Sequence, residues 1–129
     1  LSEANIEEFV TPYTHTILEY FGGGYIHYCG KNPHLFEAVM NEPLAYGLNF
    51  GNPEKHDMAD VLRTCAEKGK IFVGVINRQE NETPYEYFKK YIEASRIDGR
   101  SHLLLDYSCS REERDRVIEA WESAQQSRA

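Results

Sequence analysis

Apolar residues gather in four short runs along the chain, and each run has the length and composition of a buried strand. The runs cover residues 25–29, 45–50, 70–76 and 102–107. The intervals between them are too long for hairpin turns, and each carries the start signals of a helix. We therefore predict four β-strands, each followed by a helix.

Three of these helices begin with a polar residue followed by proline: Asn32-Pro33, Asn52-Pro53 and Thr83-Pro84. An Asn or Thr side chain can accept a hydrogen bond from the unpaired N–H groups of the first turn, and proline has no N–H to leave unpaired. Thr83 with Glu86, and Ser110 with Glu113, also have capping-box spacing. The second box predicts the last helix, over about residues 111–126.

Glycines and prolines mark the other boundaries of the predicted helices. Gly69 and Gly99 each follow a helical segment, and both suit a left-handed helix end. Gly22-Gly23-Gly24 is interpreted as a helix stop as well, because it precedes a strand, whereas a dinucleotide-binding loop follows one. At the amino terminus, apolar residues recur at helical spacing over residues 3–21, where Thr11-Pro12 indicates a kink or a second helix start.

The order of elements is one helical segment followed by four βα units, which defines an α/β fold. Strands joined by helical crossovers run parallel, and their uninterrupted apolar runs are typical of strands buried on both faces. Four such strands could form a small open sheet or half of an eight-stranded barrel, a fold that ordinarily needs about 250 residues. The pattern leaves both architectures open.

Length and charge narrow the class of protein. A chain of 129 residues has room for one domain, assigned to residues 1–129. Its net charge of −7 disfavours nucleic acid and anionic membrane surfaces as partners. No apolar run approaches the roughly 18 residues of a membrane span, so we expect a soluble, cytoplasmic protein. Three cysteines are too few for a disulfide framework, which fits a reducing compartment.

The segment His27-Tyr28-Cys29-Gly30 ends the first predicted strand and carries the most informative chemistry. Alternation along a strand places His27 and Cys29 on the same face, at the carboxyl end where parallel α/β proteins hold their sites. Cys109 follows the fourth strand and would reach the same rim. One nitrogen and two thiolates are a known ligand set for catalytic zinc. The alternative is a hydrogen-bonded histidine and two cysteines that merely pack.

Two asparagines occupy comparable places on the middle strands. Asn49 and Asn77 lie at the carboxyl ends of the second and third predicted strands. Side chains at that rim often hold substrates in parallel α/β proteins. We predict that both are substrate-binding residues.

The motifs together resemble the carboxyl-terminal half of the uroporphyrinogen decarboxylase superfamily. The resemblance lies in Ser2-x-x-x-x-x-Glu8-Phe9-Val10-x-Pro12, in the glycine-flanked strand ending His27-x-Cys29-Gly30, and in Leu48-Asn49-Phe50-Gly51-Asn52-Pro53. It implies a (β/α)8 TIM barrel of which the four βα units are the carboxyl-terminal half. The missing strands would come from a second copy in a homodimer or from an amino-terminal barrel half.

Within that superfamily, His-x-Cys followed much later by a third Cys marks the zinc-dependent corrinoid:coenzyme M methyltransferases. The resemblance therefore implies zinc bound by His27, Cys29 and Cys109, activation of a small thiol acceptor, and a methyl group delivered on a separate corrinoid protein. True decarboxylases lack His-x-Cys here and end with a Gly-His-Gly-like element, where this chain has Tyr107-Ser108-Cys109-Ser110. The alternatives are a uroporphyrinogen decarboxylase-type lyase, acting on a tetrapyrrole-like substrate, and a non-catalytic truncated barrel domain.

Overall fold

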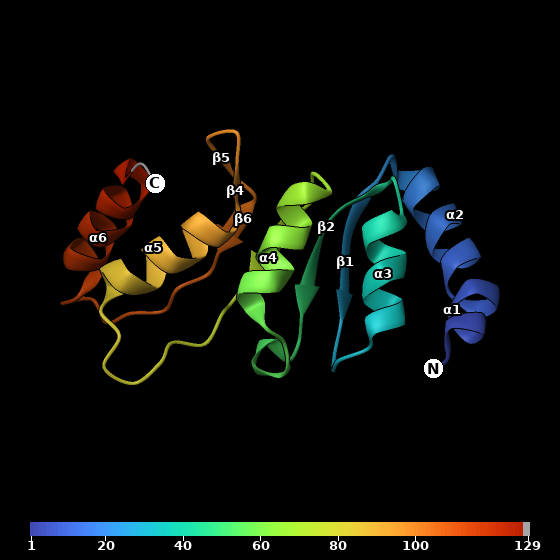
Figure 1. Ribbon diagram of the computed structural model, residues 1–129, viewed down its shortest axis with the longest axis horizontal. Helices are drawn as coiled ribbons and strands as arrows, with labels where there is room; N and C mark the ends of the chain where they lie inside the picture. The colour runs from blue at the N-terminus through green and yellow to red at the C-terminus, as the bar shows by residue number, and fades with distance from the viewer. Residues whose placement is uncertain (128–129) are drawn as a thin grey trace.

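A computed structural model describes residues 1–127, which contain the predicted leading helical segment and four βα units, together with a short two-stranded hairpin that was not predicted (Figure 1). The elements, in chain order, are α1 (Glu3–Phe9), α2 (Thr11–Phe21), β1 (Gly24–Tyr28), α3 (Pro33–Asn41), β2 (Ala45–Phe50), the 3-10 turn η1 (Pro53–Lys55), α4 (Met58–Glu67), β3 (Ile71–Gly74), α5 (Pro84–Ala94), β4 (Arg96–Ile97), β5 (Arg100–Ser101), β6 (Leu103–Leu105) and α6 (Arg114–Gln126). Among these residues, no helix is long and apolar enough to cross a membrane.

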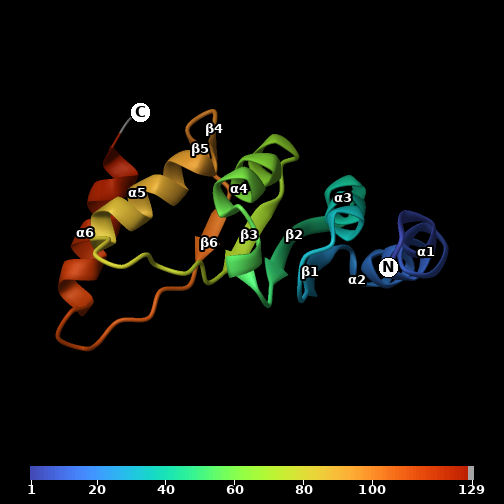
Figure 2. The same ribbon diagram turned by 60° about the horizontal axis from the view of Figure 1, so that its bottom comes forward.

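Four parallel strands form the main sheet, in the order β1-β2-β3-β6. The predicted α/β class is therefore confirmed, with β3 and β6 shorter than their apolar runs. Each new strand adds to the same edge of the sheet, and crossovers of one hand then place every connecting helix on the same face. Figure 2 shows α3, α4 and α5 together on one side of the strands. Within residues 1–127, no helix covers the opposite side.

Side chains on the two faces of the sheet differ in burial. The helix-covered face carries the core, in which Leu48, Phe50 and Phe72 are buried among the apolar side chains of α3, α4 and α5. On the opposite face, Tyr25 is 56 % exposed and Leu104 is 62 % exposed. Parallel sheets are ordinarily covered on both faces, so this sheet has an unusual bare face.

Most predicted helix starts are confirmed, but one is wrong. The Asn32 side chain accepts from the N–H of Leu35, and Thr83 and Glu86 form the predicted capping box. The prolyl start at Pro53, however, opens only the three-residue 3-10 turn η1, because the Asn52 amide oxygen accepts from the Gly30 N–H instead of capping a helix. Helix α4 starts later, with Asp57 as its N-cap.

Two further boundaries differ from the prediction near the end of the chain. Gly99, predicted to end a helix, lies with Asp98 in the turn between β4 and β5, where both residues have positive φ angles of 76° and 50°. Such a turn is typical of tight β-hairpins. Ser110 and Glu113 form their reciprocal hydrogen bonds, but around a turn that precedes α6. Gly69, by contrast, follows α4 in the predicted left-handed conformation, with φ 68°.

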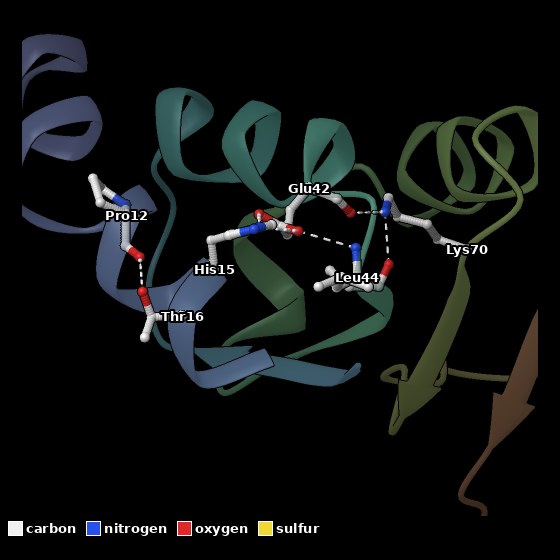
Figure 3. Close-up of polar contacts among 7 residues, drawn as sticks. Pro12, His15, Thr16, Glu42, Leu44 and Lys70 are labelled. Atoms are coloured by element: carbon white, nitrogen blue, oxygen red, sulfur yellow. Dashed lines mark hydrogen bonds and ion pairs between the residues drawn. The ribbon is translucent and has the colours of Figure 1, made fainter. Parts of the chain in front are cut away.

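A polar network around the buried Glu42 and Lys70 connects the helices α2 and α3 to the amino-terminal ends of the strands β2 and β3 (Figure 3). The Glu42 carboxylate, at the end of α3, lies 3.1 Å from Nδ1 of His15 and accepts from the Leu44 N–H. The buried Lys70 ammonium, just before β3, donates to the carbonyl oxygens of Glu42 and Ala45, at 2.6 Å each. The network joins α2, α3 and the starts of β2 and β3.

This network predicts an acid-sensitive contribution to stability. Burial by itself would raise the pKa of Glu42, but the Leu44 N–H, His15 and Lys70 together hold that pKa below its usual value. A carboxylate with a lowered folded-state pKa stabilises the fold above its unfolded pKa of about 4.3, and this contribution disappears as the pH falls through the folded value. We expect Glu42→Gln to be less stable than the wild type near neutral pH, with the difference shrinking below about pH 4. Urea midpoints across pH test this, and a constant difference would contradict it.

Candidate functional site

The carboxyl ends of β1 and β2 carry a cluster of polar side chains on the bare face of the sheet. His27 and Cys29 come from β1 and the residue just beyond it, and both are exposed. Their ring nitrogen Nε2 and thiol Sγ lie 3.5 Å apart and face one another. The predicted convergence of these two side chains on one face is therefore confirmed.

Asn49 of β2 supports the histidine from the other side. Its register partner on β1 is His27, and its Oδ1 lies 2.5 Å from Nδ1 of the His27 ring. Its Nδ2 donates to the carbonyl oxygen of Val73 on β3, also at 2.5 Å. The imidazole is thus connected through one amide to the backbone two strands away.

Two glycines leave the space that this cluster occupies. A Cβ built on Gly51 would collide with Sγ of Cys29, and a Cβ on Gly74 would collide with Nδ2 of Asn49. Gly74 also has φ 138°, a backbone conformation that other residues rarely adopt. The positions of the thiol and of the amide therefore both require glycine beside them.

The separation of His27 and Cys29 fits two ligands of one zinc ion. Zinc binds nitrogen at about 2.05 Å and sulfur at about 2.3 Å with tetrahedral angles, which places the two donor atoms about 3.6 Å apart. The observed 3.5 Å between Nε2 and Sγ agrees with that value. A hydrogen bond between a thiol and an imidazole has a similar length, so the same geometry also describes the metal-free pair.

Cys109 is not assembled with the other two predicted ligands. It is exposed and lies in the irregular segment between β6 and α6, whereas His27 and Cys29 are on β1, at the opposite edge of the sheet. Three strand spacings of about 4.8 Å separate the two outer strands. In the part of the chain that the structure describes, no group of three or more His, Cys, Asp or Glu side chains is placed to hold a metal ion.

Cys65 differs from Cys29 and Cys109 in its burial. Cys65 is fully buried in α4, where burial raises the pKa of its thiol to about 12, against the opposing effect of Lys70. A thiol with that pKa remains protonated near neutral pH and is a poor metal ligand or nucleophile. Cys29 and Cys109 are both exposed, as ligands of a metal at the rim need to be.

The two predicted substrate-binding residues have different surroundings. Asn77 is exposed and lines a hollow of about 320 Å³ that also contains His56, Asp57 and Lys90. Both polar groups of Asn49 already have partners within the chain. The substrate-binding role of Asn49 and Asn77 stays a prediction. Of these two asparagines, only Asn49 is hydrogen-bonded to the His27–Cys29 pair.

The contact between His27 and Asn49 was not predicted from the sequence. The predicted strands 25–29 and 45–50 differ in length, so the pairing of these two residues depends on the register between β1 and β2, for which neither strand carries a signal. The roles of Gly51 and Gly74 had no signal either, because they depend on which side chain packs across the neighbouring strand.

Comparisons with known proteins leave the family open. No protein-family model, curated protein or solved structure matches this chain. The resemblance to the uroporphyrinogen decarboxylase superfamily therefore stays a prediction based on the motifs quoted above.

Proposed function

We propose that the chain is the carboxyl-terminal half of a (β/α)8 barrel that binds zinc and activates a thiol for methyl transfer. The support for a half barrel is the order of the strands, each added to the same edge, together with the helices gathered on one face. In an eight-stranded barrel the bare face would become the inside wall, which is filled with side chains. The exposed Tyr25 and Leu104 would then be covered.

The zinc ligands in this proposal are His27, Cys29 and Cys109. The single observation that carries it is the 3.5 Å separation of Nε2 of His27 and Sγ of Cys29, which suits two donors on one tetrahedral ion. For Cys109 to join them, the segment between β6 and α6 must fold across the carboxyl ends of the strands toward β1. Three protein ligands would leave one position for the acceptor.

Zinc at this position would supply the positive charge that holds an acceptor thiol as its thiolate at neutral pH. The acceptor would lose its thiol proton to solvent, and its sulfur would use an electron pair to bond the methyl carbon. A corrinoid on a partner protein would supply that methyl group and keep the electrons of the broken methyl–cobalt bond. Both the acceptor and that partner would approach His27 and Cys29 from the carboxyl ends of the strands, where the two side chains are exposed.

The missing barrel half is part of the same proposal. The main sheet ends at β1 on one side and β6 on the other, and each outer strand has an edge without a pairing partner among the described residues. Open sheet edges in native proteins are covered or paired. A second copy of the chain or a separate amino-terminal half would provide the pairing strands, and light scattering of the purified protein distinguishes a monomer from an assembly.

Zinc binding tests the proposal directly. We expect the purified wild type to bind about one equivalent of zinc, and His27→Ala, Cys29→Ser and Cys109→Ser each to weaken binding at least about 100-fold, more than loss of a supporting contact costs. Competition with a chromophoric chelator gives the affinities. Cobalt substitution gives an independent signature, because each thiolate ligand adds sulfur-to-cobalt charge-transfer absorption.

Cys65→Ala is the matched control, because it removes a cysteine that is buried away from the site. We expect it to retain zinc affinity and the cobalt spectrum. Absence of zinc binding by the wild type would overturn the proposal. Loss of binding in His27→Ala and Cys29→Ser but not in Cys109→Ser would remove the three-ligand site, and with it the methyltransferase assignment.

A further inference from the structure

We propose that Asn49 is a positioning residue that holds the His27 proton on Nδ1 and leaves Nε2 unprotonated, facing the Cys29 thiol. The use of that arrangement for metal binding rests on the proposed function. The proton position itself does not, because it follows from contacts within the chain. A series of hydrogen bonds connects Val73 on β3, through Asn49 on β2, to His27 on β1.

The orientation of the Asn49 amide is set by β3. The carbonyl oxygen of Val73 lies 2.5 Å from Nδ2 of Asn49, and a backbone carbonyl can only accept a hydrogen bond. The nitrogen end of the amide must therefore point to β3, and the oxygen end to β1. An amide turned the other way would bring two oxygen atoms together at that distance.

The orientation of the amide then determines the tautomer of the histidine. Oδ1 of Asn49 can only accept, so the Nδ1 atom of His27, 2.5 Å away, must carry a hydrogen. In a neutral imidazole one nitrogen donates and the other accepts, and the hydrogen bond made by one nitrogen decides the state of the other. Nε2 is consequently left with a lone pair, directed at Sγ of Cys29 at 3.5 Å.

Packing keeps the amide in this position. Gly74 provides the space beside Nδ2, since a Cβ there would collide with it, and Asn49 is half-buried between the neighbouring strands. Metal-binding histidines in proteins ordinarily donate their second ring N–H to such an oxygen, which fixes the tautomer and the ring orientation. Here the supporting contact is already made by residues of three adjacent strands.

The tautomer can be measured by nitrogen-15 NMR of the imidazole rings in the metal-free full chain, at about pH 8.5, where an ordinary imidazole is neutral. His27→Gln identifies which signals belong to His27. We expect the wild-type His27 to show a protonated Nδ1 and an unprotonated Nε2, the tautomer that free histidine disfavours. In Asn49→Leu, which keeps the approximate volume but removes the acceptor, we expect the population to move to the Nε2–H tautomer.

Asn41→Leu is the matched control, because Asn41 is exposed at the far end of α3 and should leave the His27 signals unchanged. Circular dichroism checks that Asn49→Leu is folded, and the wild-type spectrum alone decides the case if it is not. A wild-type His27 with its proton on Nε2, or an unchanged tautomer in folded Asn49→Leu, would overturn the inference.

Zinc affinity separates this inference from the proposed function. We expect Asn49→Leu to bind zinc about 10–100-fold more weakly than the wild type, the usual cost of losing such a supporting contact. If the wild type has the Nδ1–H tautomer and Asn49→Leu loses it, but no variant binds zinc, the positioning role stands and the metal site fails. Unchanged zinc affinity in Asn49→Leu would overturn the role of Asn49 in metal binding.

Discussion

Replacing Phe72 with alanine is expected to lower the free energy of unfolding by about 3–5 kcal/mol, the usual cost of deleting a fully buried aromatic side chain. Phe72 lies on β3 in the middle of the sheet, with none of its surface exposed, and its ring contacts that of Phe50 at a centroid distance of 5.9 Å. Its removal would leave a cavity between β3 and the helices that cover it. Urea denaturation followed by circular dichroism measures the loss.

Two further variants make this prediction specific. Phe9→Ala removes the same side chain from an exposed position on α1, and we expect a change within about 0.5 kcal/mol. Phe72→Leu keeps most of the buried volume and should lie between the wild type and Phe72→Ala, which retains a measurable transition if the alanine variant does not fold. Equal losses in Phe9→Ala and Phe72→Ala would contradict the placement of Phe72 in the core.

Replacing Lys70 with methionine is expected to lower the free energy of unfolding by about 2–4 kcal/mol. Methionine keeps much of the apolar stem but removes the ammonium that donates to the carbonyl oxygens of Glu42 and Ala45. A hydrogen bond that involves a charged group contributes about 1.5–3 kcal/mol, and the Glu42 carbonyl keeps a second partner in the Ala45 N–H at 3.2 Å. Burial lowers the pKa of Lys70, and the negative charge of the nearby Glu42 carboxylate opposes that effect. The two charges therefore attract each other, and Lys70→Met also removes this attraction.

Lys68→Met is the control for this variant. Lys68 is two residues away and exposed, with only a 3.4 Å contact to Asn41. We expect its loss to change stability by less than about 0.5 kcal/mol. A comparable loss in both variants would show that the effect comes from net charge and not from the buried hydrogen bonds, and would contradict the role assigned to Lys70.

Local signals were sufficient where a residue acts within its own segment. The caps at Asn32 and Thr83 and the left-handed glycines after α2 and α4 all function as predicted. Asn52 and Gly99 were misassigned because other partners competed for them. The Asn52 amide is taken by Gly30, from a segment 22 residues earlier, and Gly99 joins Asp98 in a hairpin turn.

The candidate site divides in the same way. Strand alternation alone placed His27 and Cys29 on one face, since neighbours two apart on a strand always share a face. The contact of His27 with Asn49 depends on the register between β1 and β2, which no feature of either strand states by itself. The position of Cys109 depends on how the segment after β6 folds, and the structure leaves it at the opposite edge from β1.

The four βα units, the parallel α/β class and the shared face of His27 and Cys29 could be predicted from the sequence, because periodicity and capping act over a few residues. The bare face of the sheet, the contact between the β2 asparagine and the β1 histidine, and the burial of Cys65 beside the exposure of Cys29 became known only from the folded chain. These features arise from contacts between segments far apart in the chain, and such contacts are set by the packing of whole elements against one another.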